Sequence, residues 1–306
     1  MKKAMKTNFF PTFFVIVAQK AGTTTLHDML RCESSVELPS IKETHFFSDD
    51  ERNARGMDWY LKWFDDKGPG SVRGEVDPDY MFFHRSAERI ADIAPDPKIV
   101  IILRNPLDRA YSQYRMSKRR GFETLPIVRA LIEEPQRLAE GTVQALKQHS
   151  YASRGRYAQQ IDRWKHALPR ADFLFIRFED FVKPETKPET YCRICDFIGV
   201  RTTLTSQKMR VISNPASVPN STLLTGLLWG DSGMKRLLKP MAHILLPKKD
   251  TRGKIAIMLD QWNRKPGPPT HEDWWSDLPA EICTDCATEI RKAEAATGMD
   301  LSDWLS

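Results

Sequence analysis

Two runs of consecutive apolar residues constrain the fold of this chain most. Residues 13–17 read FFVIV and residues 99–103 read IVIIL, and neither run contains a polar residue. A strand exposed on one face alternates apolar and polar residues, whereas an unbroken apolar strand is buried on both faces, as in a parallel sheet. A polar loop and a helical pattern follow each run. The pattern therefore predicts an α/β fold in which helices flank a parallel sheet.

The remaining segments supply further helices and strands. Short strands are predicted within residues 71–77 and 171–180, and the second is predicted to be buried and to end at Glu179 and Asp180. Ser86 is the predicted N-cap of one helix. Apolar residues at helical spacing predict helices within residues 23–31, 56–64, 86–95, 107–120, 124–148, 155–168, 189–199 and 289–305.

Length and composition fit a single domain over residues 1–306, with a basic tail at residues 1–10. The chain is 41% hydrophobic, which is enough for a sizeable core. Its net charge of +6 suits an anionic ligand, a polyanion or an anionic membrane surface and does not choose among them. The N-terminal run looks like a signal peptide, but Pro11 interrupts it and cleavage would remove the first strand. We therefore expect a cytoplasmic protein.

The five cysteines include two C-x-x-C pairs, Cys192 with Cys195 and Cys283 with Cys286. Two such pairs can form a four-thiolate zinc site. Both pairs lie in helical patterns, however, where the same spacing places two small apolar side chains on one helix face. We expect no metal site and leave the role of the pairs open.

The segment after the first apolar run predicts an anion-binding loop. A nucleotide-binding P-loop reads G-x-x-x-x-G-K-[ST], but here Lys20 precedes Gly22, and Thr23 stands at the lysine position. Backbone amides between a strand and a helix bind anions, and Thr24 and Thr25 add further hydroxyl donors. The loop is therefore predicted to bind an anion, although its lysine is not at the position that a P-loop requires.

The segment LRNPLDRAYSQY, at residues 103–114, is a second candidate for phosphate binding. Arg104 follows a buried strand, at the sheet edge where ligands of open α/β sheets bind. Ser112 lies about two helical turns further on, so that a guanidinium and a hydroxyl would grip one phosphate together. The alternative is an ion pair between Arg104 and Asp108.

Residues 42–47, KETHFF, carry the candidate general bases. Glu43 and His45 alternate, so both side chains face the same way if the segment is extended. The alternatives are a surface salt bridge for Glu43 and a structural role for His45. Further along the chain, Trp59, Trp63 and Tyr80 line an acceptor pocket in one interpretation and belong to the core in the other.

In this order, the three segments resemble the sulfotransferase family that uses 3′-phosphoadenosine 5′-phosphosulfate (PAPS). The resemblance is to the heparan-sulfate-type branch, which includes N-deacetylase/N-sulfotransferases and 3-O-sulfotransferases, and to its bacterial relatives. QKAGTTTL is similar to the family's 5′-phosphosulfate loop, and ILRNPLDRAYSQY to its 3′-phosphate segment. The segments GEVDPDYMF, SRGRYAQQIDRW and TGMDLSDWL also look like the family, so the resemblance covers essentially the whole chain. It implies a P-loop-NTPase-like fold.

The resemblance implies roles for individual residues. Lys20 would stabilise the leaving oxygen as the S–O bond breaks, and Glu43 would be the general base, with His45 as the fallback. The residues expected to contact the acceptor are Glu75, Asp77, Trp59 and Tyr80. The residues expected to bind PAPS, without a metal ion, are Lys20, Ala21, Gly22, Thr23, Thr24, Thr25, Arg104 and Ser112.

The chain departs from the family's pattern at three places. Ala18 replaces a usual glycine, and Asn220 replaces an arginine of bacterial relatives, so that Arg210 or Arg154 would complete the 3′-phosphate site. The heparan-sulfate enzymes carry a lysine near the position of Asp77 that is missing here. A sulfated polysaccharide acceptor is therefore in doubt.

The acceptor is expected to be a hydroxyl or amine of a carbohydrate, lipid or other small molecule, with no nucleic acid partner. Residues 222–250 are apolar with interspersed basic residues, and form a membrane-surface helix, a pocket wall or a core helix in the three interpretations left open. The rival functions are a P-loop nucleotide kinase and a non-catalytic anion-binding protein of the same fold.

Overall fold

The chain divides into two compact units. The sheet unit comprises Met1–Arg109, Arg154–Asn214 and Cys283–Ser306, and the second unit comprises Ala110–Ser153 and Pro215–Ile282. The expectation of a single domain stays a prediction. The computed structural model describes residues 10–65, 67–68, 70–211, 217–219, 221, 224, 255, 258–259, 262–266 and 274–305.

A five-stranded parallel sheet forms the centre of the sheet unit, which confirms the predicted fold class. Its strand order is β2-β3-β1-β4-β5, so the central strand β1 pairs with β3 on one side and with β4 on the other. The strands are β1 (Phe13–Val15), β2 (Val36–Glu37), β3 (Val72–Val76), β4 (Lys98–Leu103) and β5 (Asp172–Arg177).

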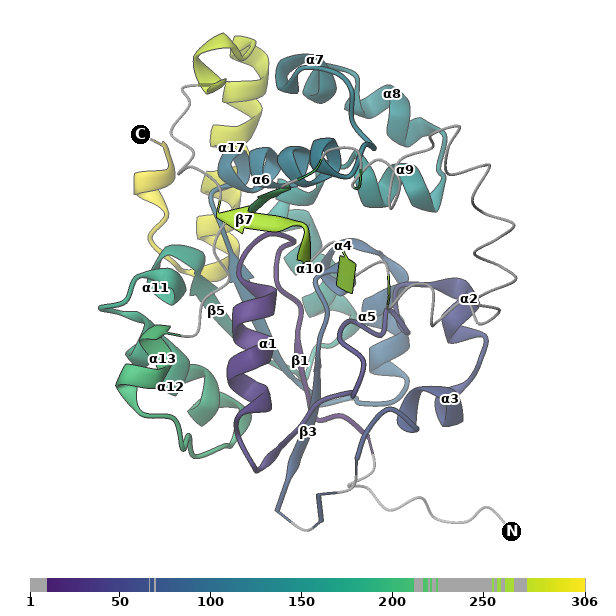
Figure 1. Ribbon diagram of the computed structural model, residues 1–306, viewed down its shortest axis with the longest axis vertical. Coiled ribbons are helices and arrows are strands. Elements are labelled where there is room, and N and C mark those ends of the chain that lie inside the picture. The colour runs from purple at the N-terminus through teal and green to yellow at the C-terminus, as the bar shows by residue number, and fades with distance from the viewer. Residues whose placement is uncertain are drawn as a thin grey trace. The chain divides into compact units, whose positions relative to one another are not determined.

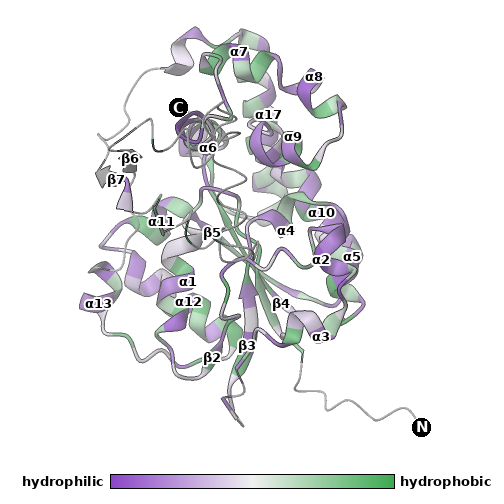
Figure 2. Cartoon of the chain, turned by 45° about the vertical axis from the view of Figure 1, so that its right-hand side comes forward, coloured by the Kyte–Doolittle hydropathy of each residue, from purple (hydrophilic) through white to green (hydrophobic). Residues whose placement is uncertain are grey.

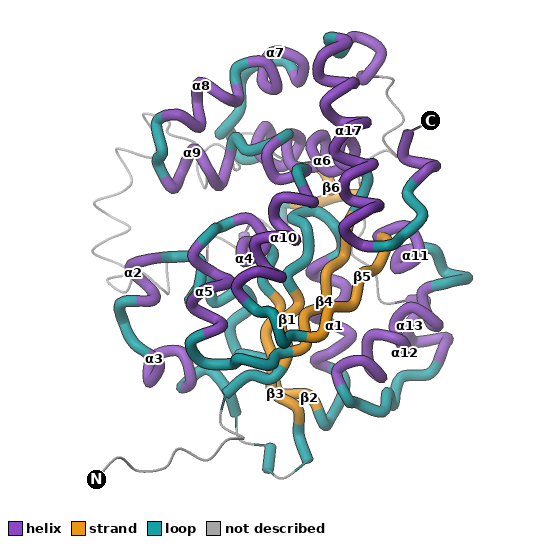
Figure 3. Tube along the Cα trace, turned by 180° about the vertical axis from the view of Figure 1, so that it is seen from behind, coloured by secondary structure: helices purple, strands orange, loops and turns teal. Residues whose placement is uncertain are grey.

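Helices cover both faces of this sheet, which is why β1 and the part of β4 after Lys98 are apolar throughout. The helices α1 and α12 lie on one face, and α5 and α10 lie on the other (Figures 1 and 3). Every residue of β1 is buried, as is every residue of β4 after Lys98. The strand β4 is accordingly coloured as hydrophobic in Figure 2, whereas the helices carry both colours.

The remaining described elements of the sheet unit are helices and 3₁₀ turns, and the sequence analysis did not predict the helices at residues 50–53, 79–82, 178–182 and 206–211. The remaining elements are α1 (Thr23–Arg31), α2 (Asp50–Asn53), α3 (Met57–Leu61), α4 (Asp79–Phe82), α5 (Arg85–Ala91), α10 (Tyr157–Ala167), α11 (Phe178–Val182), α12 (Lys187–Ile198), α13 (Ser206–Val211) and the 3₁₀ turns Ser153–Gly155 and Ser302–Leu305. Two helices, α6 (Pro106–Arg119) and α17 (Ala280–Thr297), cross the border between the units.

Further details differ from the sequence prediction. The strand β5 ends at Arg177, so Glu179 and Asp180 belong to α11, and only Ile176 of this strand is buried because β5 is an edge strand. Ser86 is a buried residue inside α5 and does not cap it; the N-cap is His84. The two-residue strand β2 was not predicted.

The register between β1 and β3 depends on one glycine. Gly74 pairs with Phe13, and a Cβ atom on Gly74 would lie 2.3 Å from the Phe13 ring. Such a distance is a steric overlap, so only glycine fits here beside this aromatic ring. The ring of Phe13 therefore occupies the space of the missing side chain.

The second unit contains short helices and an antiparallel strand pair. Glu123 holds its loop together by accepting hydrogen bonds from Leu125 N (2.9 Å), Tyr151 OH (2.9 Å) and Arg137 Nη1 (2.6 Å). The described elements of the second unit are α7 (Ile127–Ile132), α8 (Glu134–Ala139), α9 (Val143–Gln148), β6 (Ser217–Pro219), β7 (Arg264–Pro266) and the 3₁₀ turn Trp274–Asp277.

Of residues 222–250, only Leu224 is described, so the predicted apolar-basic segment lies outside the described residues. No described helix has both the length and the apolar character needed to span a bilayer.

Candidate active site

The loop after β1, where the sequence predicts anion binding, leads directly into α1. Its start stays paired with β4, because Ala18 N donates to Ile102 O at 3.0 Å. The backbone then turns sharply, with positive φ angles at Lys20 (77°) and Gly22 (88°). The helix α1 begins directly afterwards, and no side chain caps its first turn. The amides of that turn lack intrahelical acceptors, as in helix termini that bind phosphate.

Arg104 lies against this loop, as the sheet-edge argument predicts. Its Nη1 donates to Lys20 O at 3.2 Å, and its guanidinium lies 4.8 Å from the centre of the Phe178 ring. The alternative ion pair with Asp108 is absent from the contacts of the described residues. Burial lowers the pKa of Arg104, although nearby carboxylates oppose the effect. Ser112 lies on α6 in the second unit, and its pairing with Arg104 stays a prediction.

Two carboxylates at the end of β3 hold the segment that carries Glu43 and His45. Thr44 N donates to Glu75 Oε1 at 3.0 Å, and His45 N donates to Asp77 Oδ2 at 2.8 Å. Both Glu43 and His45 have positive φ angles, 57° and 52°, which residues other than glycine rarely adopt. Hydrogen bonds from the sheet edge therefore support a backbone conformation that the local sequence does not favour.

Glu75 is itself fixed by two tyrosines. Its Oε2 accepts from Tyr60 OH and from Tyr80 OH, each at 2.8 Å, and Tyr80 OH also lies 3.1 Å from Thr44 Oγ1. Burial raises the pKa of Glu75 to about 7, with Asp77 adding to the effect and the three donors opposing it. Glu75 is 1% exposed and Tyr80 is fully buried. In the structure these two residues support the Glu43 segment, and their role as acceptor contacts stays a prediction.

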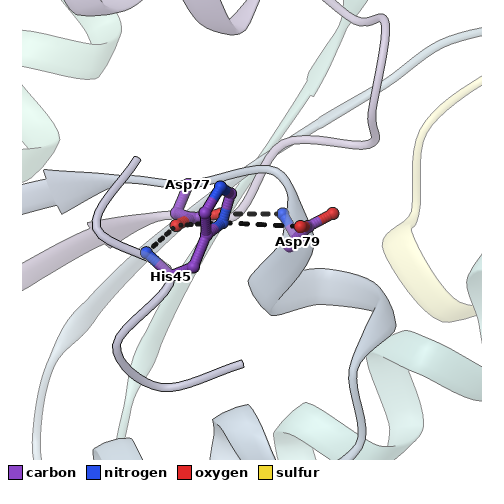
Figure 4. A group of neighbouring side chains, drawn as sticks. All are labelled: His45, Asp77 and Asp79. Atoms are coloured by element: carbon purple, nitrogen blue, oxygen red, sulfur yellow. Dashed lines mark hydrogen bonds and ion pairs between the residues drawn. The ribbon is translucent and has the colours of Figure 1, made fainter. Parts of the chain in front are cut away.

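His45 lies between the carboxylates of Asp77 and Asp79 (Figure 4). Its Nδ1 is 3.0 Å from Asp77 Oδ2 and 3.4 Å from Asp79 Oδ2. Burial alone would lower the pKa of His45. The charge of Asp77 and its hydrogen bond, with a smaller contribution from the charge of Asp79, raise this pKa to about 9. The imidazole is therefore protonated at neutral pH.

The group formed by His45, Asp77 and Asp79 has the residue types of a metal site, and its ligand atoms lie within 4.8 Å of one another. Its oxygens already have partners inside the protein. Asp77 Oδ1 accepts from Asp79 N at 2.9 Å, and Arg154 Nη1 lies 3.0 Å from Asp79 Oδ1. The Arg154 side chain is buried and stacks on Phe82, and its part in the 3′-phosphate site stays a prediction. Arg210, the other alternative for that role, is exposed on α13.

Lys42 is a residue of this site to which the sequence analysis gave no role. Its Nζ donates to Thr24 Oγ1, in the first turn of α1, at 2.5 Å and lies 3.4 Å from Glu43 Oε1. Burial, followed by the charges of Asp77 and Asp79, raises the pKa of Glu43, and Lys42 is the main opposing charge. The signal in the sequence is its place directly before Glu43 in KETHFF.

Trp59 packs in the way that the core interpretation describes. Its ring stacks on Phe46 with centres 6.0 Å apart, and Trp63 meets it edge-on at 5.9 Å. Two cations also lie near its ring, Arg55 at 5.2 Å and Lys62 at 5.5 Å. Its predicted contact with the acceptor stays a prediction.

The cysteines form no disulfide. Burial raises the pKa of both Cys195 and Cys286 to about 12, so both are protonated thiols at neutral pH. A zinc site requires thiolates, which these environments disfavour.

Comparison with known proteins places the chain in a family. Residues 10–220 match the sulfotransferase domain family. Human heparan sulfate glucosamine 3-O-sulfotransferase 6 is 30% identical over 200 residues, covering 65% of this chain and 55% of that protein. Human bifunctional heparan sulfate N-deacetylase/N-sulfotransferase 3 is 31% identical over 210 residues, or 62% of this chain and 22% of that protein. The chain thus matches only part of the length of these relatives.

Solved structures agree with this assignment. The crystal structure of a sulfotransferase from Alicyclobacillus acidocaldarius has a TM-score of 0.65 and 26% identity, covering 97% of this chain and 99% of that chain. A mouse sulfotransferase complexed with PAP, the product of PAPS, shares the fold, with a TM-score of 0.50 and 13% identity over 96% of this chain and 87% of that chain. The chain therefore belongs to the sulfotransferase domain family, as the resemblance of its sequence segments implied.

Proposed function

We propose that this protein transfers a sulfuryl group from PAPS to a hydroxyl or amine, with Glu43 as the general base. The observation that carries the proposal is the position of Glu43, held by β3 and linked through Lys42 to the first turn of α1. The acceptor oxygen or nitrogen forms a bond to sulfur while the bond from sulfur to the bridging oxygen breaks. The acceptor proton passes to the Glu43 carboxylate, and the electron pair of the broken bond stays on the 5′-phosphate of PAP.

Glu43 suits the role of general base better than His45. The carboxyl has a raised pKa, which makes it a stronger base than an ordinary glutamate. His45 has its pKa raised to about 9 and carries a proton at neutral pH, so it has no free position to accept another. Its charge instead offsets those of Asp77 and Asp79 beside the base.

The cofactor is proposed to lie over the loop and the first turn of α1. Lys20 would neutralise the charge that develops on the bridging oxygen. Arg104 and Ser112 would bind the 3′-phosphate, and the contact of Arg104 with Lys20 O supports the closeness of the two phosphate sites. The proposed acceptor is a carbohydrate, lipid or other small molecule, and the names of the relatives favour a carbohydrate.

Ligand-dependent thermal unfolding tests the cofactor placement. PAP and ADP are added without Mg²⁺ to the wild-type protein and to Arg104→Ala. At about 100 times its Kd, a specific ligand stabilises the folded state by about 2.7 kcal/mol. We expect stabilisation of the wild-type protein by PAP but not by ADP, and its loss in Arg104→Ala. Equal stabilisation by both nucleotides would contradict the proposal and favour a nucleotide kinase.

Transfer of radiolabelled sulfate from PAPS then identifies the acceptor. Candidate acceptors are glycosaminoglycan oligosaccharides, glycolipids and phenols, and each is tested with the wild-type protein and with Glu43→Gln. Labelled product that forms only with the wild-type protein supports the proposed base. Equal labelling by both proteins would exclude Glu43 from that role.

A further inference from the structure

We propose that Lys42 is a further catalytic residue, whose ammonium group contacts both the sulfuryl group of PAPS and the carboxylate of Glu43. The inference rests on the proposed function, in which the phosphosulfate lies at residues 20–25 and Glu43 is the base. It assigns a task to a residue that neither phosphate-binding segment contains.

The ammonium group of Lys42 lies close to both the first turn of α1 and the carboxylate of Glu43. Lys42 Nζ is within hydrogen-bonding distance of Thr24 Oγ1 and 3.4 Å from Glu43 Oε1. Thr24 is the second residue of α1, whose first turn has no side-chain cap. The Lys42 side chain is 32% exposed and that of Glu43 is 28% exposed, so a ligand can reach both. An anion bound at this turn would therefore lie beside the ammonium group.

The donor count supports a shared contact. A lysine ammonium has three N–H donors, and the contacts with Thr24 and Glu43 use two of them. The third can bind an oxygen of the sulfuryl group. That group is anionic and must approach the anionic carboxylate of Glu43 during transfer, and a cation between two anions offsets their repulsion.

This role differs from that of Lys20, and the difference can be measured. Lys20 is assigned to the bridging oxygen, which PAP retains on its 5′-phosphate. Lys42 is assigned to the transferred group, which PAP lacks. Loss of the Lys42 charge should therefore weaken the binding of PAPS and leave the binding of PAP unchanged.

Calorimetric titration with PAPS and PAP provides the test without a known acceptor. We compare the wild-type protein with Lys42→Met, Lys42→Arg and the control Lys208→Met, which removes an exposed charge on α13. In Lys42→Met the Kd for PAPS should rise about tenfold, because a charge-assisted hydrogen bond is lost, while the Kd for PAP stays within about twofold. Lys42→Arg should recover most of the affinity, and Lys208→Met should match the wild type.

A double substitution tests whether Lys42 acts together with Glu43. The loss of PAPS affinity caused by Lys42→Met should differ by more than about twofold between the wild-type and Glu43→Gln backgrounds, since interacting residues are not additive. Equal losses of PAPS affinity in both backgrounds would contradict the proposed interaction between Lys42 and Glu43.

Two other outcomes would also overturn the inference. They are an equal loss of PAP and PAPS affinity in Lys42→Met, and no loss of either. A failure of the proposed function looks different, because the wild-type protein would then not prefer PAP to ADP.

Discussion

His45 is joined to Asp77 twice, once through its backbone and once through its ring. The backbone N–H donates to Asp77 Oδ2 at 2.8 Å, and Nδ1 lies 3.0 Å from the same oxygen. One carboxylate thus fixes both the path of the chain at His45 and the charge of its imidazole. The first prediction follows from that charge.

The ion pair between His45 and Asp77 should make the free energy of unfolding depend on pH above neutrality. The folded-state pKa of His45, about 9, lies above the ordinary value of 6.5, so the stabilisation is complete below about pH 6.5 and is lost as the pH rises through 9. The difference between these two pKa values corresponds to about 3 to 4 kcal/mol at most. Urea unfolding at pH 6 and pH 9.5 should show this decrease in the wild-type protein and a smaller one in His45→Gln. The same decrease in both proteins would contradict the prediction.

Replacement of Glu43 by glutamine should abolish most of the chemistry and leave cofactor binding intact. Removal of a general base lowers kcat by about 100-fold or more, whereas the Kd for PAP should change little because PAP lacks the transferred group. The matched control is Glu51→Gln, an exposed glutamate on α2. A kcat in Glu43→Gln within a few-fold of the control would rule out Glu43 as the base.

The two tyrosines on Glu75 should differ in their effect on catalysis. Tyr60→Phe and Tyr80→Phe each remove one hydrogen bond to Oε2, which costs about 1 kcal/mol of unfolding free energy. Only Tyr80 also contacts Thr44, next to the base. We therefore expect both a larger loss of stability and a larger decrease of kcat in Tyr80→Phe. Equal kcat values in the two variants would show that the Thr44 contact does not position the base.

Gly22→Ala should weaken the binding of PAP. The φ angle of 88° disfavours any side chain by about 1 to 2 kcal/mol, and the new Cβ would lie 3.2 Å from the Phe181 ring. Gly56→Ala is the control, because Gly56 has a φ of 79° with no atom within 4 Å of the added Cβ. Isothermal titration should show at least about a tenfold larger Kd for PAP in Gly22→Ala only. The same loss in both variants would mean that the crowding against Phe181 is unimportant.

The sequence predicted the parts of the fold that leave a local signature. Burial on both faces makes β1 and β4 wholly apolar, and the bounds of α1 follow from a glycine and a helical pattern. Strand order leaves no such signature. The aromatic residues of β5 indicated a buried strand, but β5 pairs only with β4 and its Phe173 and Phe175 are partly exposed.

The candidate site was predictable where motif residues adjoin a strand end. Arg104 and Lys20 meet because the carboxyl ends of neighbouring parallel strands share one edge. The support of the base was not predictable in this way. Glu75 contacts Thr44 across 31 positions of sequence, and the positive φ angles of Glu43 and His45 oppose local preference, so only tertiary hydrogen bonds reveal them.

The contact between Gly74 and Phe13 limits how the sequences of homologous chains can vary in β3. Glu75 and Asp77 face Thr44 and His45 because Gly74 is aligned with the Phe13 ring. Since side chains alternate along a strand, a deletion of one residue in β3 would turn both carboxylates to the opposite face. All the residues proposed to take part in the reaction would still be present after such a change. Glu75 and Asp77, however, would no longer hold the segment that carries Glu43. We therefore expect homologous chains to vary in length around β3 but to keep the spacing from Gly74 to Asp77 unchanged.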